Sequence, residues 1–196
     1  MKSFVLSLLL LSCLCCFADD TNIIAMSDWS APVEFNRIAV RGRLLIVESS
    51  QPALGWPASK SSARMFIELQ KVSPGTGTEF YVDTVSHLNC ELVNKDGTSV
   101  PLAPSGGWDG GGGRLPYRVV LPSDSIGRIF VADGPMSPLV IHPNGIPSRR
   151  WSIPAGDTNV YYLSGTLSVI TPENQTNSDW EGKLVFPKTK ILANKQ

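Results

Sequence analysis

Residues 161–169 read YYLSGTLSV, and their apolar and polar side chains alternate with a period of two. The apolar members are Tyr161, Leu163, Leu167 and Val169, and the polar members are Tyr162, Ser164, Thr166 and Ser168. Successive side chains of an extended chain point to opposite faces, so one set can pack on a core while the other meets water. The pattern predicts a half-buried β-strand.

The same alternation recurs along the chain after residue 18. It covers residues 38–46, 64–70 and 79–83, and shorter candidate strands follow at 116–121, 127–132, 138–142, 150–153 and 183–186. All 17 Gly and 15 Pro also lie after residue 18, where they separate these segments. No segment there shows a helical period over the roughly ten residues that a helix needs. Many short strands with frequent turns predict an all-β fold, a single antiparallel β-sandwich of the Ig-like type.

One hairpin and one long loop can be placed within this fold. Residues 91–93 lead into a turn at 94–97, and residues 98–100 return. Asp96-Gly97 supplies the left-handed backbone that a tight turn requires, and Pro101 ends the return strand because proline has no N–H for a ladder. Residues 105–113 contain six glycines, with strand-like segments on both sides. We therefore predict a Gly-rich loop 105–113 inside one domain that spans residues 19–196.

The first eighteen residues predict export. Lys2 supplies a positive start, residues 4–11 are almost wholly apolar, and small residues lead to Ala18 before the acidic Asp19. This order is that of a cleavable secretory signal peptide, residues 1–18, with cleavage after Ala18. The apolar run is shorter than the roughly 20 residues that a membrane span needs. We expect a periplasmic or secreted protein with no membrane span.

The cysteines leave one alternative open. Three of the four lie inside the signal peptide, at positions 13, 15 and 16, so the exported chain keeps Cys90 alone and forms no internal disulfide. Cys90 shares the apolar side of its segment with Leu88 and Leu92, which predicts a buried structural thiol. The alternative is a bacterial lipoprotein site at residues 10–13, where a lipid anchor would attach to Cys13.

The charge balance argues against general nucleic-acid binding. The full chain has 17 basic and 17 acidic residues, and removal of Lys2 with the signal peptide leaves 16 against 17. Nucleic-acid binding would need a strongly basic face. Arg37, Arg41 and Arg43 fall on one side of a predicted strand. We interpret them as a solvated strand face rather than as an anion or partner contact.

Motifs for catalysis, metals and nucleotides are lacking. The two histidines, His87 and His142, do not occur in a paired metal spacing. No Gly-x-Ser-x-Gly elbow is present, and the acidic residues lack the spacing of a calcium loop. Residues 105–113 precede a predicted strand rather than a helix, so they do not match a phosphate-binding loop. The sequence nominates no catalytic residue, no metal ligand and no cofactor.

Two tryptophans among turn-forming residues are the candidate contacts for a ligand or partner. Trp108 and Asp109 lie within the Gly-rich loop, and Trp56 is flanked by Gly55 and Pro57. An exposed indole is a good platform for a sugar or a partner side chain, and binding residues concentrate on loops. The alternative is that either ring folds back over the core.

A partial resemblance to known families rests on a succession of segments. FIELQKVS at residues 66–73 resembles the opening strand of exported bacterial Ig-like sandwiches. The segments that follow are CELVNKDGTSV at 90–100, VLPSDS at 120–125, WSIPAGD at 151–157 and YYLSGTL at 161–167. Their order is similar to that of the proteinase-inhibitor-like β-sandwich family. The ending WxGKLVFP at 180–187 is similar to that of a set of uncharacterised exported bacterial proteins.

This resemblance implies an Ig-like fold and carries over no activity. The insertion at 105–113 departs from the inhibitor-like pattern, and no inhibitory loop is identified. We expect a non-catalytic exported β-sandwich that binds a protein or glycan at the cell surface, or that has a structural role at the cell envelope. Two alternatives stay open: a protease-inhibitor-like module, and an envelope hydrolase, since a catalytic triad is spatial and needs no sequence motif.

Overall fold

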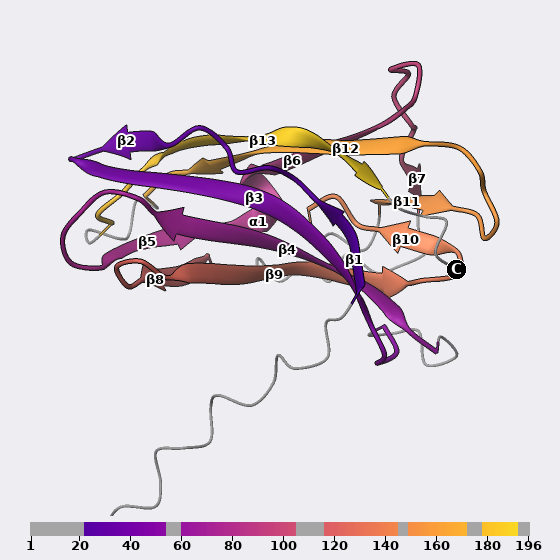
Figure 1. The fold of residues 1–196 in the computed structure, drawn as a ribbon, viewed down its shortest axis with the longest axis horizontal. Coiled ribbons are helices and arrows are strands. Elements are labelled where there is room, and N and C mark those ends of the chain that lie inside the picture. The colour runs from indigo at the N-terminus through magenta and orange to yellow at the C-terminus, as the bar shows by residue number, and fades with distance from the viewer. Residues whose placement is uncertain (1–21, 54–59, 105–115, 145–148, 172–177, 192–196) are drawn as a thin grey trace, which may run out of the picture.

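The computed structural model describes residues 22–53, 60–104, 116–144, 149–171 and 178–191 (Figure 1). Strands make up 61% of these residues and helix 3%, so the predicted all-β class is confirmed. Among the described residues no helix is both long and apolar enough to cross a bilayer. The elements in chain order are β1 (Asn22–Met26), β2 (Val33–Phe35), β3 (Ile38–Ser49), β4 (Ser62–Lys71), β5 (Thr78–Val82), α1 (Thr84–His87), β6 (Leu88–Asn94), β7 (Ala103–Pro104), β8 (Tyr117–Leu121), β9 (Ile126–Pro135), β10 (Leu139–Ile141), β11 (Arg149–Ile153), β12 (Tyr161–Val169) and β13 (Gly182–Ile191).

Within the described residues, the strands form four antiparallel sheets. The largest has the order β1-β3-β4-β9, with β2 paired to the beginning of β3. The second has the order β13-β12-β6, and two smaller sheets have the orders β10-β11-β7 and β5-β8. In Figure 1, β13, β12 and β6 run alongside β3, β4 and β9. Both faces of the core are thus built from strands.

One apolar core joins all four sheets. Its members include Leu44 and Ile67 from the largest sheet, Leu167 from the second, and side chains of β5, β8, β10 and β11. The close approach of β3 and β13 is visible at Gly42. A Cβ there would lie 3.0 Å from Leu69 Cδ2 and 3.0 Å from Phe186 Cε1, which is tighter than most Cβ contacts in proteins, so the lack of a side chain at Gly42 favours this close approach.

The segment at 161–169 is β12, the central strand of the second sheet. Leu163, Leu167 and Val169 are buried, and the polar residues between them are half-buried, as the alternation predicts. The alternation at 38–46, 64–70 and 79–83 corresponds to β3, β4 and β5. The strands β1, β2 and β7 were not predicted from the sequence. Two of these, β2 and β7, have three residues or fewer, too short for a period of two to be visible.

The predicted hairpin is present. Asn94 N donates to Thr98 O at 3.0 Å, Gly97 N donates to Asn94 O at 3.1 Å, and Gly97 has φ 88°. The return segment pairs through a single bridge between Val93 and Ser99, and Pro101 follows it. The turn chemistry was therefore predicted correctly, while the return strand is shorter than the flanking residues suggest.

Cys90 lies on β6 with its side chain half-buried against the core, between the buried Leu88 and Leu92. Desolvation by burial raises the pKa of the Cys90 thiol to about 12. The expectation of a structural thiol agrees with this environment, although the side chain is not completely enclosed.

Candidate partner-binding surface

The contacts nominated by the sequence lie outside the described residues. Trp56 falls in the segment 54–59, and Trp108 and Asp109 fall in the segment 105–115. Their role as ligand or partner contacts stays a prediction. The candidate surface described below is built from different residues, on the face of the largest sheet that points away from the core.

Three cross-strand rows cross this face from β3 through β4 to β9. Pairing in register places the same-face residues of the three strands side by side. The rows are Leu45–Phe66–Phe130, Arg43–Glu68–Arg128 and Arg41–Gln70–Ile126. We call these nine residues together with Trp29 the arginine face.

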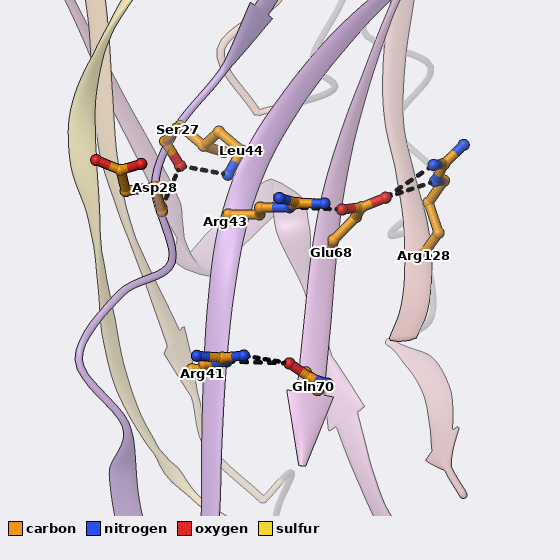
Figure 2. Close-up of polar contacts among 8 residues, drawn as sticks. All are labelled: Ser27, Asp28, Arg41, Arg43, Leu44, Glu68, Gln70 and Arg128. Atoms are coloured by element: carbon orange, nitrogen blue, oxygen red, sulfur yellow. Dashed lines mark hydrogen bonds and ion pairs between the residues drawn. The ribbon is translucent and has the colours of Figure 1, made fainter. Parts of the chain in front are cut away.

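The middle row is an ion-pair triad centred on Glu68. Arg43 Nε donates to Glu68 Oε2 at 2.7 Å, and Arg128 donates to Glu68 Oε1 from Nε at 3.1 Å and from Nη2 at 2.7 Å (Figure 2). The Glu68 side chain is only 4% exposed, against 21% for Arg43 and 32% for Arg128. Both carboxylate oxygens are therefore occupied, and the two guanidinium groups are fixed on either side.

The neighbouring row uses a neutral acceptor. Arg41 donates to Gln70 Oε1 from Nε at 3.0 Å and from Nη2 at 2.7 Å (Figure 2). Gln70 thereby holds Arg41 in an orientation close to that of Arg43, two residues along the same strand. The two side chains lie across the sheet rather than extending into water.

The prediction of a solvated strand face for the three arginines was wrong in two respects. Arg37 has φ 64° and lies in the turn between β2 and β3, so it does not belong to the strand face. Arg41 and Arg43 do lie on one side of β3, but both are bound by partners on β4. These partners are distant in sequence, so the alternation of residues along β3 could not predict them.

Trp29 stacks on both guanidinium groups. The guanidinium carbon of Arg43 lies 4.5 Å from the centroid of the Trp29 ring, and that of Arg41 lies 4.8 Å from it. Each such cation–π contact contributes on the order of 0.5–2 kcal/mol, depending on exposure. Stacking occupies the faces of the guanidinium groups and leaves their N–H edges available for other bonds.

Two buried serines determine where Trp29 lies. Leu44 N donates to Ser27 Oγ at 3.0 Å, and Gly42 N donates to Ser30 Oγ at 3.0 Å. The main-chain N–H groups of the same serines donate back to the carbonyls of Leu44 and Gly42. The segment after β1 is thus attached to the edge of β3 on both sides of Trp29. The role of Trp29 was not predicted from the sequence, because nothing in its local sequence distinguishes it from a turn residue.

Aromatic side chains extend the face toward β9. Phe66 and Phe130 meet edge to face with ring centroids 5.8 Å apart, and the Arg128 guanidinium lies 5.3 Å from the Phe66 ring. Phe66 is buried with Leu45 and Val47 in a small apolar cluster of its own, while Phe130 is 42% exposed. The face therefore combines fixed cations with an exposed aromatic ring.

A second feature, the crevice beside His142, is less suited to binding. His142 is buried, and its Nδ1 lies 3.2 Å from Arg149 O. The crevice beside it, of about 10 Å³, has mostly apolar walls that include Met65 and Val140. A space of this size holds about one water molecule, whereas small-molecule sites have volumes of roughly 300–1,000 Å³. Within the described ranges, no group of three or more His, Cys, Asp or Glu residues is placed to hold a metal ion.

No protein family, individual characterised protein or solved structure matches this chain. The resemblance to inhibitor-like and Ig-like exported sandwiches stays a prediction for this reason.

Proposed function

We propose that this chain is an exported, non-catalytic β-sandwich that binds a partner at the cell envelope through the arginine face. The observation that carries the proposal is the fixed position of Arg41 and Arg43 beneath Trp29, on a sheet face that points away from the core. Tryptophan and arginine are among the residue types most enriched at the energetic centres of protein interfaces. Fixing them before binding reduces the entropy lost on association.

The fold and the location belong to the same proposal. A shared core between the largest sheet and the β13-β12-β6 sheet supports a single sandwich of the Ig-like type. The charge, apolar run and small-residue exit of residues 1–18 support export to the periplasm or the medium. Partners in that location include surface proteins and glycans.

Photo-crosslinking in the cells that make the protein tests this proposal. A photoreactive phenylalanine analogue is introduced at Phe130 on β9, and in separate samples at Val185 on β13 and at Trp108. Phe130 and Val185 are both exposed, and they lie in different sheets. The proposal predicts an adduct of defined mass from position 130 and none from position 185. Adducts from position 108 alone would assign binding to the Gly-rich loop instead.

A further inference from the structure

We infer that the arginine face binds an extended, acidic segment of a partner protein, with carboxylates of that segment meeting Arg41 and Arg43. This inference rests on the proposed function, because it specifies the chemistry of the partner at the same surface. Its basis is the balance of hydrogen-bond donors and acceptors across the polar rows of the face.

The acceptors of these rows are already occupied. Glu68 Oε1 and Oε2 and Gln70 Oε1 each accept from a guanidinium group. Within the part of the chain that the structure describes, Nη1 of Arg41, both Nη groups of Arg43 and Nε2 of Gln70 donate no hydrogen bond. The surface thus offers donors and few acceptors. A carboxylate, which only accepts, matches it, while a neutral hydroxyl group would have its own proton left unmatched.

The charge of the face points the same way. The six residues of the two polar rows include three arginines and one carboxylate, so together these six side chains carry a net positive charge. The remaining Nη edge of Arg43 can take a carboxylate in the bidentate geometry that makes such pairs short and strong. Trp29 stacks over both guanidinium groups, and this contact uses their faces rather than their N–H edges.

The spacing of the donors favours an extended chain. Arg41 and Arg43 are two residues apart on β3, so their Cα atoms are about 6.6–7 Å apart. Alternate residues of an extended peptide have the same repeat. A segment with acidic residues at every second position can therefore present consecutive carboxylates to the two arginines.

Exposed apolar side chains favour a polypeptide over an acidic glycan. Phe130 and Ile126 are exposed on β9, on either side of Arg128. Phe130 and Ile126 can contact apolar side chains of the partner segment that alternate with its carboxylates or flank them. A uronic-acid polymer would match the arginines but has no side chains to cover these two residues.

The test uses two synthetic peptides and a glycan. In one peptide Glu alternates with Val, in the other Gln replaces every Glu, and polygalacturonate represents acidic glycans. Binding to the full-length mature protein is measured by fluorescence anisotropy at low and high salt. Arg41→Gln removes a face cation whose partner is the neutral Gln70, so it leaves no unpaired carboxylate. Lys183→Gln removes an exposed charge on β13 and serves as the matched control.

We expect the Glu peptide to bind about tenfold more tightly than the Gln peptide, with a loss of affinity at high salt. Arg41→Gln should weaken binding several-fold, while Lys183→Gln should leave it unchanged. Equal affinities for the two peptides, or equal effects of the two variants, would overturn the inference. Binding of polygalacturonate in preference to the Glu peptide would also overturn it. If position 130 still gives an adduct in cells, such results contradict only the acidic partner. Absence of any adduct contradicts the proposed function itself.

Discussion

Arg43 Nε lies 2.7 Å from Glu68 Oε2 on the outer face of the largest sheet, and the Glu68 side chain is almost completely removed from solvent. Taking a carboxylate out of water costs several kcal/mol unless charges and hydrogen bonds compensate for it. Here two guanidinium groups supply the compensation. Each depends on the same carboxylate, so the position of Arg43 is linked through Glu68 to that of Arg128 on another strand.

Replacing Glu68 should test this linkage. Glu68→Gln keeps the volume, removes the charge and places an amide donor opposite a guanidinium donor. Because the arginines can still reach water, we expect the free energy of unfolding to fall by about 1–3 kcal/mol. Urea denaturation followed by tryptophan fluorescence measures the change.

The exposed ion pair between Glu79 and Arg118 provides the control for Glu68→Gln. Arg118 donates to both Glu79 oxygens at 2.6 Å, and this hydrogen-bonded ion pair lowers the pKa of the Glu79 carboxyl. Solvent screens an exposed pair strongly, so Glu79→Gln should change stability much less than Glu68→Gln. Equal losses for the two variants would show that burial of Glu68 has no special effect.

Cys90 should react slowly in the folded protein. With its pKa raised to about 12, the thiol is protonated at neutral pH, and the protonated form is a poor nucleophile. Labelling with a disulfide reagent at pH 8 should be slow under native conditions and fast in denaturant. Rapid native labelling would contradict the burial of this thiol.

The same thiol predicts a loss of stability in alkali. Its pKa is 9.0 when unperturbed and higher in the folded state, so the unfolded chain loses its proton first. The contribution of Cys90 to stability is complete below about pH 9 and is lost as the pH rises toward about 12. Cys90→Ala should remove this part of the pH dependence of urea unfolding, measured between pH 8 and pH 11.

Gly42 tests the contact between the two large sheets. In Gly42→Ala the new Cβ would lie 3.0 Å from Leu69 Cδ2 and from Phe186 Cε1, tighter than ordinary van der Waals contact. Overpacking of this kind costs about 1–3 kcal/mol. Gly97→Asn is a suitable control, because Gly97 lies in an open turn with φ 88° and asparagine tolerates this conformation. Thermal denaturation of both variants measures the effect, and we expect a lower melting temperature for Gly42→Ala than for Gly97→Asn. An unchanged melting temperature for Gly42→Ala would contradict the close packing.

Intact-mass analysis of the secreted or periplasmic protein tests export. We expect a mature chain that begins at Asp19, because Ala18 ends the small-residue exit of the signal peptide. A mass that includes residues 13–18 and a lipid on Cys13 would instead assign a membrane anchor.

The strands were predictable where the period of two is long enough to be visible. At β12 each buried leucine is followed by a polar residue, and one face of the strand borders the core. The rule fails at Leu45 and Val47 on β3. These residues are buried on the outer face, so the middle of β3 is apolar on both sides. A strand covered on both faces has no alternation to detect.

The arginine face could not be predicted, because register is a property of the folded sheet. Arg43 and Glu68 are 25 residues apart in the chain, and Arg128 is a further 60 residues on. A shift of one residue in the pairing of β3 with β4 would place Glu68 and Arg43 on opposite faces of the sheet. Trp29 depends on the contacts of Ser27 and Ser30 with the edge of β3, which also form only in the folded protein.

Hydroxyl-radical footprinting tests the central claim most directly. The mature protein is oxidised alone and in the presence of the envelope fraction of the producing cells, and oxidation of each side chain is measured by mass spectrometry. If the arginine face binds the partner, oxidation of Trp29 and Phe130 falls, while Tyr162 on the second sheet is unaffected. Protection of Trp108 or Tyr162, with Trp29 and Phe130 oxidised as in the isolated protein, would contradict the assignment of binding to the arginine face.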